Sequence, residues 1–430
     1  MKRISTNPRG ALANTAVIAI VVVILIVAVV GAYAAISLGG SKTVTTTNTN
    51  TVTSTQTSTN TQTSTVTSTT STTSSGVSLS GALNMAGSTL VQPLMSSWTF
   101  AFTQVQPGVQ ANYQSVGSGA GITDFTAQTV SIGASDAPMT SAQYAALPAT
   151  ALTVPESISA VVPAYNLPGI KNGVNFTGNV LAQIFLGTIT QWNDPQLVAL
   201  NPGITLPAHA IQVVHRSDGS GTMYAFTNYL SDSNAQWASQ VGYSTNPSWP
   251  TGLGCKGNEG VAGCIENTQY SIGPLEIAYA IQNPSLISWG QVKNAAGNYI
   301  TATGCASASN CTASTIEAAV QAGASGLPAG NAQWTHVSII NNIFNDTAAT
   351  TAYPITTFTY LFIYQAQSNL NTAEISVSFL WWAVNHAQTA GVPLGYIPLP
   401  SDVVSLDDAT IQSITYSGTS VCTQAPSVCA

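Results

Sequence analysis

Short apolar stretches that each run into a Gly- and Ser-rich turn recur along this chain from about residue 81, and they constrain its fold more than any other feature. These stretches have the character of β-strands that end in polar turns, at residues 81–89, 109–121, 130–139, 158–166 and 209–222. Helical stretches follow some of them, at 90–108, 122–128 and 223–230. Strands that alternate with helices predict an α/β fold.

Three of the strand-to-helix junctions consist of small residues: GST at 87–89, GSGAG at 117–121 and GSGT at 219–222. Small residues let the backbone approach a ligand, and the free amides of a helix N-terminus bind anions without a net positive charge. A single junction of this kind is more often only a helix cap, because Ser and Thr are preferred there. Three together indicate a site for an oxyanion.

One arginine, Arg216, lies in the third junction, within the string HRSDGSGTM at 215–223, and it is the only arginine after residue 9. Arg216 and Asp218 could form an ordinary exposed ion pair, which stabilises a protein little. The alternative is that Arg216 gives charge-assisted hydrogen bonds to an oxyanion while Asp218 holds its guanidinium in place. The scarcity of arginine in the chain favours the second interpretation.

Asp136, in the string GASDAP, is either a turn residue or an acceptor in the same site. A carboxylate in an anion site repels an unprotonated oxyanion but accepts a hydrogen bond from a protonated one. Hydrogen phosphate carries such a proton near neutral pH, whereas sulfate does not. Asp136 therefore predicts selectivity for phosphate.

The charge balance argues against nucleic-acid binding. After residue 80 the chain has four basic residues against fifteen acidic ones, so the formal charge of this part is 4 − 15 = −11. A surface of this kind repels DNA and RNA. Long-range attraction of an anion is also weak, so an anion site must work through close contacts.

The six cysteines fall into three pairs that are close in sequence: Cys255 with Cys264, Cys305 with Cys311, and Cys422 with Cys429. Local disulfides are the favoured prediction, and they imply an oxidising exterior. Zinc is the alternative, but none of the pairs has CxxC spacing and histidine is scarce. We expect no metal and no cofactor.

The N-terminal part predicts export. A basic segment at 1–15 precedes an uncharged apolar run at 16–37, long enough to span a bilayer, with the N-terminus in the cytoplasm. The junction resembles the pilin-like signals of some archaeal binding proteins, so a membrane anchor is favoured over cleavage and release. Residues 38–80 are rich in Ser and Thr, which predicts a stalk. Sequons at Asn175, Asn310 and Asn345 predict a glycoprotein.

Residues 81–410 resemble the phosphate-binding proteins of phosphate ABC transporters. The resemblance is carried in order by the strings AGSTLVQPL, NYQSVGSGAGITDF, VSIGASDAPMT, LGTITQWNDPQLVALNPGITLP, VVHRSDGSGTMYAFTNYL, WPTGLGCKGNEGVAG and YPITTFTYLFI. It implies a two-lobed periplasmic-binding-protein fold of type II, each lobe a mixed sheet flanked by helices, with a double-strand hinge. The lobes would be 81–165 plus 352–430, and 166–351.

The resemblance also implies a binding role without catalysis: the chain would bind inorganic phosphate outside the cell membrane and deliver it to ABC permease subunits with their ATPase. By position, the phosphate contacts would be Thr89, Leu90, Ser118, Asp136, Arg216, Ser220, Gly221 and Thr222, with Asp218 bracing Arg216. Leu90 stands where the family often has Phe, and His215 where a second Arg is common.

Other functions remain open from the sequence. A related protein for another oxyanion, a phosphate sensor, a surface adhesion protein and a phosphatase-like protein are the alternatives. Hydrolase chemistry has little support, because Ser220 lies in no GxSxG elbow and the histidines lack metal-ligand spacing.

Overall fold

The computed structural model describes residues 78–430, apart from 308, 325, 336 and 338. The predicted segments 1–15 and 16–37, and all of 38–80 except its last three residues, lie outside the described residues. Within the described part of the chain, no helix is both long and apolar enough to cross a membrane.

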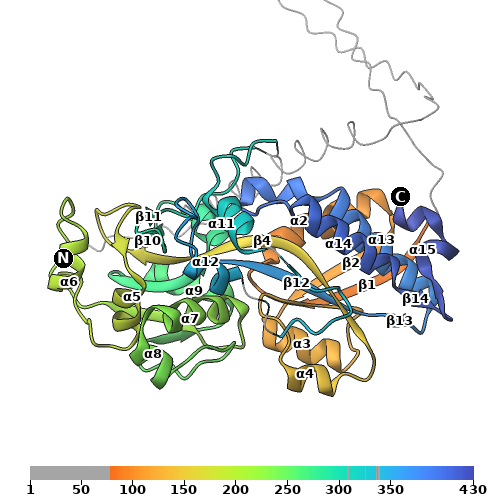
Figure 1. Ribbon diagram of the computed structural model, residues 1–430, viewed down its shortest axis with the longest axis horizontal. Helices are drawn as coiled ribbons and strands as arrows, with labels where there is room; N and C mark the ends of the chain where they lie inside the picture. Colours follow the sequence, from red (N-terminus) through yellow and green to blue (C-terminus); the bar gives the residue numbers. More distant parts are fainter. Residues whose placement is uncertain (1–77, 308, 325, 336, 338) are drawn as a thin grey trace, which may run out of the picture. The chain divides into compact units, whose positions relative to one another are not determined.

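A nine-stranded mixed sheet forms the centre of the described chain (Figure 1). Its order is β2 (Gly108–Ser115), β1 (Ser80–Gly87), β3 (Ile132–Ser135), β12 (Thr356–Tyr364), β4 (Ala151–Asn166), β8 (Ser271–Glu276), β6 (Gln212–Arg216) and β7 (Leu253–Cys255), with β9 (Ser288–Trp289) paired to β4. Two small sheets consist of β11 (Tyr299–Ile300), β10 (Gln291–Lys293) and β5 (Asn175–Phe176), and of β13 (Ala366–Gln367), β14 (Thr415–Tyr416) and β15 (Thr419–Ser420).

Helices pack on the sheet, as the α/β prediction requires. They are α2 (Gln92–Val105), α3 (Ser118–Thr126), α4 (Ser141–Ala146), α5 (Gly178–Phe185), α6 (Pro195–Leu200), α7 (Gly221–Ser233), α8 (Ala235–Gln240), α9 (Gly257–Asn267), α10 (Ile277–Gln282), α11 (Thr315–Gly323), α12 (Ile339–Asn345), α13 (Leu370–Asn385), η1 (Gln388–Leu394), α14 (Ser401–Gln412), α15 (Val421–Gln424) and η2 (Pro426–Cys429). Figure 1 shows α2 and α13 on one side of β1 and β2, and α3 on the other.

β4 connects two groups of strands. Its residues 151–160 pair with β12, and its residues 161–166 pair with β8. We call β1, β2, β3 and β12 the first strand group, and β6, β7 and β8 the second strand group. Every residue of β4 except the last is buried, so the strand runs through the core along almost its whole length.

The predicted elements are present, with one extension. The strand expected at 158–166 begins at Ala151 instead, because Pro155 and Glu156 are atypical of a strand interior and hide its first half in the sequence. The register with β12 shifts between Thr359 and Tyr360, opposite these residues. This bulge accommodates Pro155 within the sheet.

All three sequence-local cysteine pairs form disulfides: Cys255–Cys264, Cys305–Cys311 and Cys422–Cys429. The first joins the end of β7 to α9. It therefore ties α9 to β7. Residues of the site described below lie at the start of α9.

Candidate functional site

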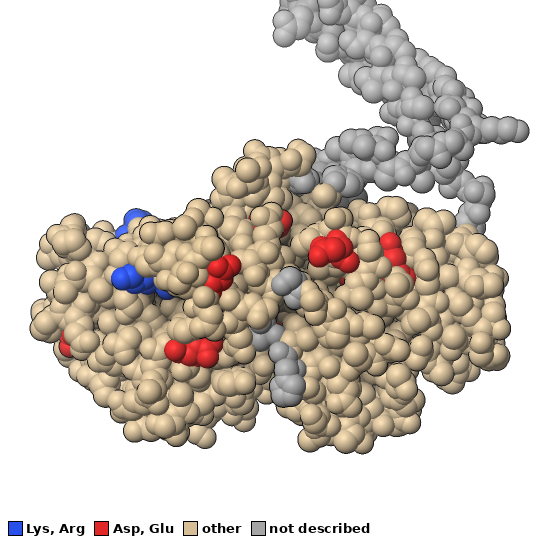
Figure 2. Space-filling view, in the orientation of Figure 1, with Lys and Arg blue, Asp and Glu red and all other residues tan. Residues whose placement is uncertain are grey.

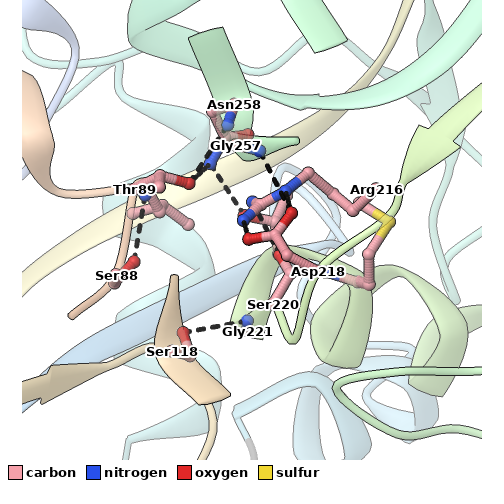
Figure 3. Close-up of polar contacts among 12 residues, drawn as sticks. Ser88, Thr89, Ser118, Arg216, Asp218, Ser220, Gly221, Gly257 and Asn258 are labelled. Carbon is pink, nitrogen blue, oxygen red and sulfur yellow. Dashed lines mark hydrogen bonds and ion pairs between the residues drawn. The ribbon is translucent and has the colours of Figure 1, made fainter. Parts of the chain in front are cut away.

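The three small-residue junctions meet in the structure, although they are far apart in the sequence (Figure 3). The amide of Gly221, in the first turn of α7, donates a hydrogen bond of 3.0 Å to Ser118 Oγ at the start of α3. The amide of Gly119 donates one of 3.0 Å to the carbonyl oxygen of Gly219. The junction after β6 in the second strand group therefore contacts the junction after β2 in the first.

Asp136 follows β3 and is 2% exposed. Its Oδ1 accepts hydrogen bonds from Ser88 Oγ at 2.5 Å and Thr359 Oγ1 at 2.9 Å, whereas Oδ2 accepts a longer bond of 3.4 Å from Ser118 Oγ. Burial raises the pKa of Asp136 to about 6, against the opposing effects of these hydroxyls and of Arg216. The carboxylate is therefore mostly ionised at neutral pH, and Oδ2 is the oxygen better able to accept a further hydrogen bond.

Arg216 is the last residue of β6, and two residues of the loop that follows hold its guanidinium in place. Asp218 accepts from Nε at 2.7 Å and from Nη2, and Ser220 Oγ accepts from Nη1 at 2.8 Å. A guanidinium has five N–H groups, and these contacts use three of them. One hydrogen on each terminal nitrogen is left for another acceptor, so a buried and immobilised cation can contact an oxyanion with two donors.

The predicted ion pair between Arg216 and Asp218 is present, and Asp218 is itself held in place. Its Oδ1 accepts a hydrogen bond of 3.0 Å from the amide of Gly257, at the start of α9 (Figure 3). Burial alone would raise the pKa of Asp218, but the hydrogen bonds and charge of Arg216 outweigh it and lower that pKa. Asp218 thus stays ionised, and it keeps the plane of the guanidinium fixed.

Three hydroxyl groups of the site accept hydrogen bonds from N–H donors. Ser220 Oγ, which caps α7, accepts from Arg216 and from the Met223 amide at 3.3 Å. Thr89 Oγ1 accepts two hydrogen bonds and Thr222 Oγ1 accepts one, all from Asn258. An oxygen whose lone pairs are occupied can use its hydrogen only as a donor. Ser220 and Thr89 are therefore donors suited to an anion, and the hydrogen of the Thr222 hydroxyl points away from Asn258.

Three tyrosines hold the backbone of residues 88–90 in place. Their hydroxyls donate to the three successive carbonyl oxygens of this loop at 2.6–2.7 Å, from Tyr113, Tyr279 and Tyr396 in turn. Tyr113 lies in β2, Tyr279 in α10 and Tyr396 just after η1, so separate parts of the chain hold the loop. A loop held in this way presents its hydroxyl groups with little freedom to reorient.

Two of the predicted contact residues have backbone amides that donate to hydroxyl groups of the protein. The amides of Leu90 and Gly221 donate at 3.0 Å to Ser88 Oγ and Ser118 Oγ. Buried backbone amides nearly always have a hydrogen-bond partner. The other site residues predicted from the sequence (Thr89, Ser118, Asp136, Arg216, Ser220 and Thr222) are all at most 2% exposed and belong to the same cluster.

Two further buried carboxyl groups lie near the site. Burial raises the pKa of Glu276 to about 8 and the pKa of Glu156 well above its ordinary value, and the charge of Asp136 adds to both shifts. Glu276 is therefore mainly protonated at neutral pH, and the raised pKa of Glu156 favours its neutral form. This keeps the negative charge around Asp136 low, which favours an anionic ligand.

Two histidines stack on aromatic rings. His215 stacks on Trp249 with ring centroids 4.7 Å apart, and His209 stacks on Tyr270 at 4.0 Å. Within the part of the chain that the structure describes, no cluster of three or more His, Cys, Asp and Glu side chains could hold a metal ion. The surface in Figure 2 carries few charged side chains, in keeping with a chain in which only 5% of residues are charged.

Sequence reasoning missed three residues of the cluster. Ser88 had a signal, because it belongs to the GST junction. Asn258 lies in the string GCKGNEG, which carries the family resemblance, but nothing in the string assigns it a role. Thr359 donates to Asp136 across 223 positions of sequence, and it lies in the string YPITTFTYLFI, which also carries the resemblance but assigns it no role.

The chain is similar in sequence to known proteins over most of its length. A family model described as a PBP superfamily domain matches residues 52–385. The phosphate-binding protein PstS of Haemophilus influenzae is 39% identical over 323 residues, which is 74% of this chain and 89% of that protein. PstS of Methanocaldococcus jannaschii is 31% identical over 340 residues, 75% of this chain and 84% of that protein.

A solved phosphate-binding protein from Stenotrophomonas maltophilia is similar in fold. It aligns with a TM-score of 0.56 at 16% identity and covers 76% of this chain and 92% of its own. At this identity the likeness supports the α/β fold alone.

Proposed function

This chain belongs to the family of extracytoplasmic phosphate-binding proteins of ABC transporters, and we propose that it holds inorganic phosphate where its three small-residue junctions meet. It is a substrate-binding protein and not an enzyme, and it delivers phosphate to permease subunits that work with an ATPase. The observation that carries the proposed site is the immobilised Arg216, with two N–H donors left over, in one buried cluster with the Asp136 carboxylate.

Phosphate fits this cluster because it meets both kinds of group. Arg216 and the hydroxyls of Thr89, Ser220 and Thr222 donate to its oxygens, and Asp136 Oδ2 accepts its proton. The amides of Leu90 and Gly221 and the hydroxyl of Ser118 join the site when they exchange their protein acceptors for the ligand. Sulfate has no proton for Asp136, so it leaves a buried carboxylate facing an anion.

Binding involves two lobes in this proposal, residues 81–165 plus 352–430 and residues 166–351. Support comes from β4, whose two halves pair with β12 of the first strand group and β8 of the second. Strands that pass from one group to the other are suited to act as the hinge of a type II binding protein. Closure would exclude water from the ligand and strengthen its hydrogen bonds.

Membrane anchoring is a further part of the proposal. The apolar run at 16–37 would span the cell membrane, and the Ser- and Thr-rich residues 38–80 would hold the binding domain outside. The disulfides support an oxidising location. Among the sequons, Asn310 and Asn345 are exposed and suit glycosylation, whereas Asn175 is partly buried and donates to the Leu200 carbonyl.

Calorimetric titration of the purified full-length chain tests the function directly. We expect one phosphate to bind per chain at pH 7.5, and an excess of sulfate to leave this binding unchanged. Arsenate, which also carries a proton at this pH, should compete. A chain with no measurable affinity for phosphate would refute the proposal, and competition by sulfate at pH 7.5 would refute the role of Asp136.

A further inference from the structure

Asn258 connects the two strand groups through its side chain. It lies in the first turn of α9, is fully buried, and donates from Nδ2 to Thr89 Oγ1 at 3.0 Å and to Thr222 Oγ1 at 3.1 Å. Thr89 follows β1 of the first strand group, whereas Thr222 follows β6 of the second. One amide group thus spans the two sides of the site (Figure 3 labels Thr89 and Asn258).

The rest of Asn258 is also engaged, which fixes the orientation of its amide. Its Oδ1 accepts a hydrogen bond of 3.3 Å from the amide of Glu276, and its own backbone amide donates at 3.1 Å to Thr89 Oγ1. Oδ1 is therefore occupied by a donor, so the NH₂ group must be the end that faces the two threonines. Both threonine oxygens are then acceptors toward Asn258.

A hydroxyl group that is free to rotate can present either a hydrogen or a lone pair to a ligand. Thr89 Oγ1 accepts two hydrogen bonds from Asn258, so its hydrogen must point elsewhere. Thr222 Oγ1 accepts one, which turns its hydrogen away from Asn258 in the same manner. Phosphate oxygens need donors, so this orientation organises the two hydroxyls before the ligand arrives.

We propose that Asn258 is a positioning residue for phosphate binding, which acts by fixing the hydroxyls of Thr89 and Thr222 as donors and by holding their loops together. The inference rests on the proposed function, because it assigns a role within the same site. Asn258 does so without contacting the ligand. If an acceptor replaced the NH₂ group of Asn258, the two hydroxyls would direct their hydrogens toward it and away from phosphate.

A double-mutant cycle tests this role, with phosphate affinity as the readout. Asn258→Ala should weaken phosphate binding by at least about fivefold, because both hydroxyls lose their fixed direction. In a chain that already carries Thr89→Val and Thr222→Val, the same change should weaken binding by less than about twofold. An equal loss in both backgrounds would show that Asn258 acts on the fold in general and would overturn the inference.

Asn201 offers a matched control. It is also buried, and its side chain accepts from the Asn175 amide and donates to the carbonyl oxygens of Asn175 and Leu197. Asn201→Ala removes a similar set of hydrogen bonds outside the site, so it should lower the melting temperature without changing phosphate affinity. If Asn201→Ala weakened phosphate binding as much as Asn258→Ala, the effect would be one of stability.

Asn258→Asp tests the direction of the hydrogen bonds in a chain of almost unchanged shape, in case the alanine variant fails to fold. The new carboxylate oxygen accepts from the threonine hydroxyls, so phosphate should bind more weakly than in Asn258→Ala. Wild-type affinity in Asn258→Asp at pH 7.5 would overturn the inference. A wild-type chain that does not bind phosphate would instead refute the proposed function itself, so the two failures are distinguishable.

Discussion

The backbone amide of Gly119 donates a hydrogen bond of 3.0 Å to the carbonyl oxygen of Gly219. This bond joins the start of α3 to the loop that follows Arg216, and it leaves little room for a side chain between them. A Cβ atom on Gly119 would lie 3.2 Å from the Gly219 Cα. The site is therefore built by the direct approach of two backbone segments.

Gly221→Ala should block a second close approach, between the start of α7 and the loop after β3. A Cβ atom there would lie 2.5 Å from Asp136 Cβ and 2.7 Å from its backbone, so the two segments must separate. We expect phosphate affinity to fall by about 1–3 kcal/mol, the usual cost of overpacking, in calorimetric titrations. Gly263→Ala, in α9 with no atom within 4 Å of the new methyl group, is the matched control and should bind as the wild type does. Unchanged affinity in Gly221→Ala would contradict the close approach.

Arg216→Ala should weaken phosphate binding by about 2–5 kcal/mol, because it removes a buried charged contact. Arg216→Lys should recover only part of this loss, since an ammonium group cannot contact Asp218 and an oxyanion with paired donors. Titration calorimetry measures both. Lys256→Ala removes a charge from an exposed position, next to Gly257 in the sequence, and should have little effect. If Lys256→Ala had as large an effect, charge in general, and not the fixed geometry of Arg216, would explain binding.

Sulfate exclusion should depend on pH through Asp136. Burial raises the pKa of Asp136 to about 6, so the carboxyl group gains a proton as the pH falls through that value. A protonated Asp136 can donate to sulfate, whereas the ionised form repels it. We expect sulfate to compete with phosphate at pH 5 and not at pH 7.5, in competition binding assays. Asp136→Asn should bind sulfate at both pH values. Exclusion of sulfate by this variant at pH 7.5 would contradict the role proposed for Asp136.

Glu276 should make the protein less stable as the pH rises. Burial raises the pKa of Glu276 from 4.5 to about 8 in the folded protein, so the folded state binds this proton more tightly than the unfolded state. The stabilisation is complete below about pH 4.5 and is lost as the pH rises toward 8. Melting temperatures of the phosphate-free chain between pH 5 and 8 should fall more steeply in the wild type than in Glu276→Gln. The exposed Asp402→Asn serves as control and should keep the wild-type slope.

The Cys255–Cys264 disulfide should affect binding as well as stability. Replacing both cysteines with serine should lower the free energy of unfolding by about 2–3 kcal/mol, as expected for a short closed loop. It should also weaken phosphate binding, because the segment between the two cysteines contains Gly257 and Asn258, which donate hydrogen bonds to Asp218 and Thr89. Replacing Cys305 and Cys311 in the same way is the control. That variant should be destabilised but should retain its phosphate affinity in the same titration.

Local features of this protein were predictable from its sequence. The N-cap at Ser220, the pair formed by Arg216 and Asp218, and the disulfides all depend on residues within ten positions of each other. At such short separations the chain itself limits where the partners can lie, so residue type and spacing are enough. The strand-to-helix alternation was predictable for the same reason, because hydrophobic pattern and turn residues act locally.

Only the tertiary structure decided which groups complete the site. Asn258 contacts Thr89 across 169 positions, and Thr359 contacts Asp136 across 223. Contacts between residues so far apart in sequence depend on the order and register of the sheet, which place β12 beside β3 and β6 beside β8. The extent of β4 and the burial of Glu156 and Glu276 were decided in the same way. Desolvation depends on what packs around a carboxyl group, and the sequence near that group does not contain this information.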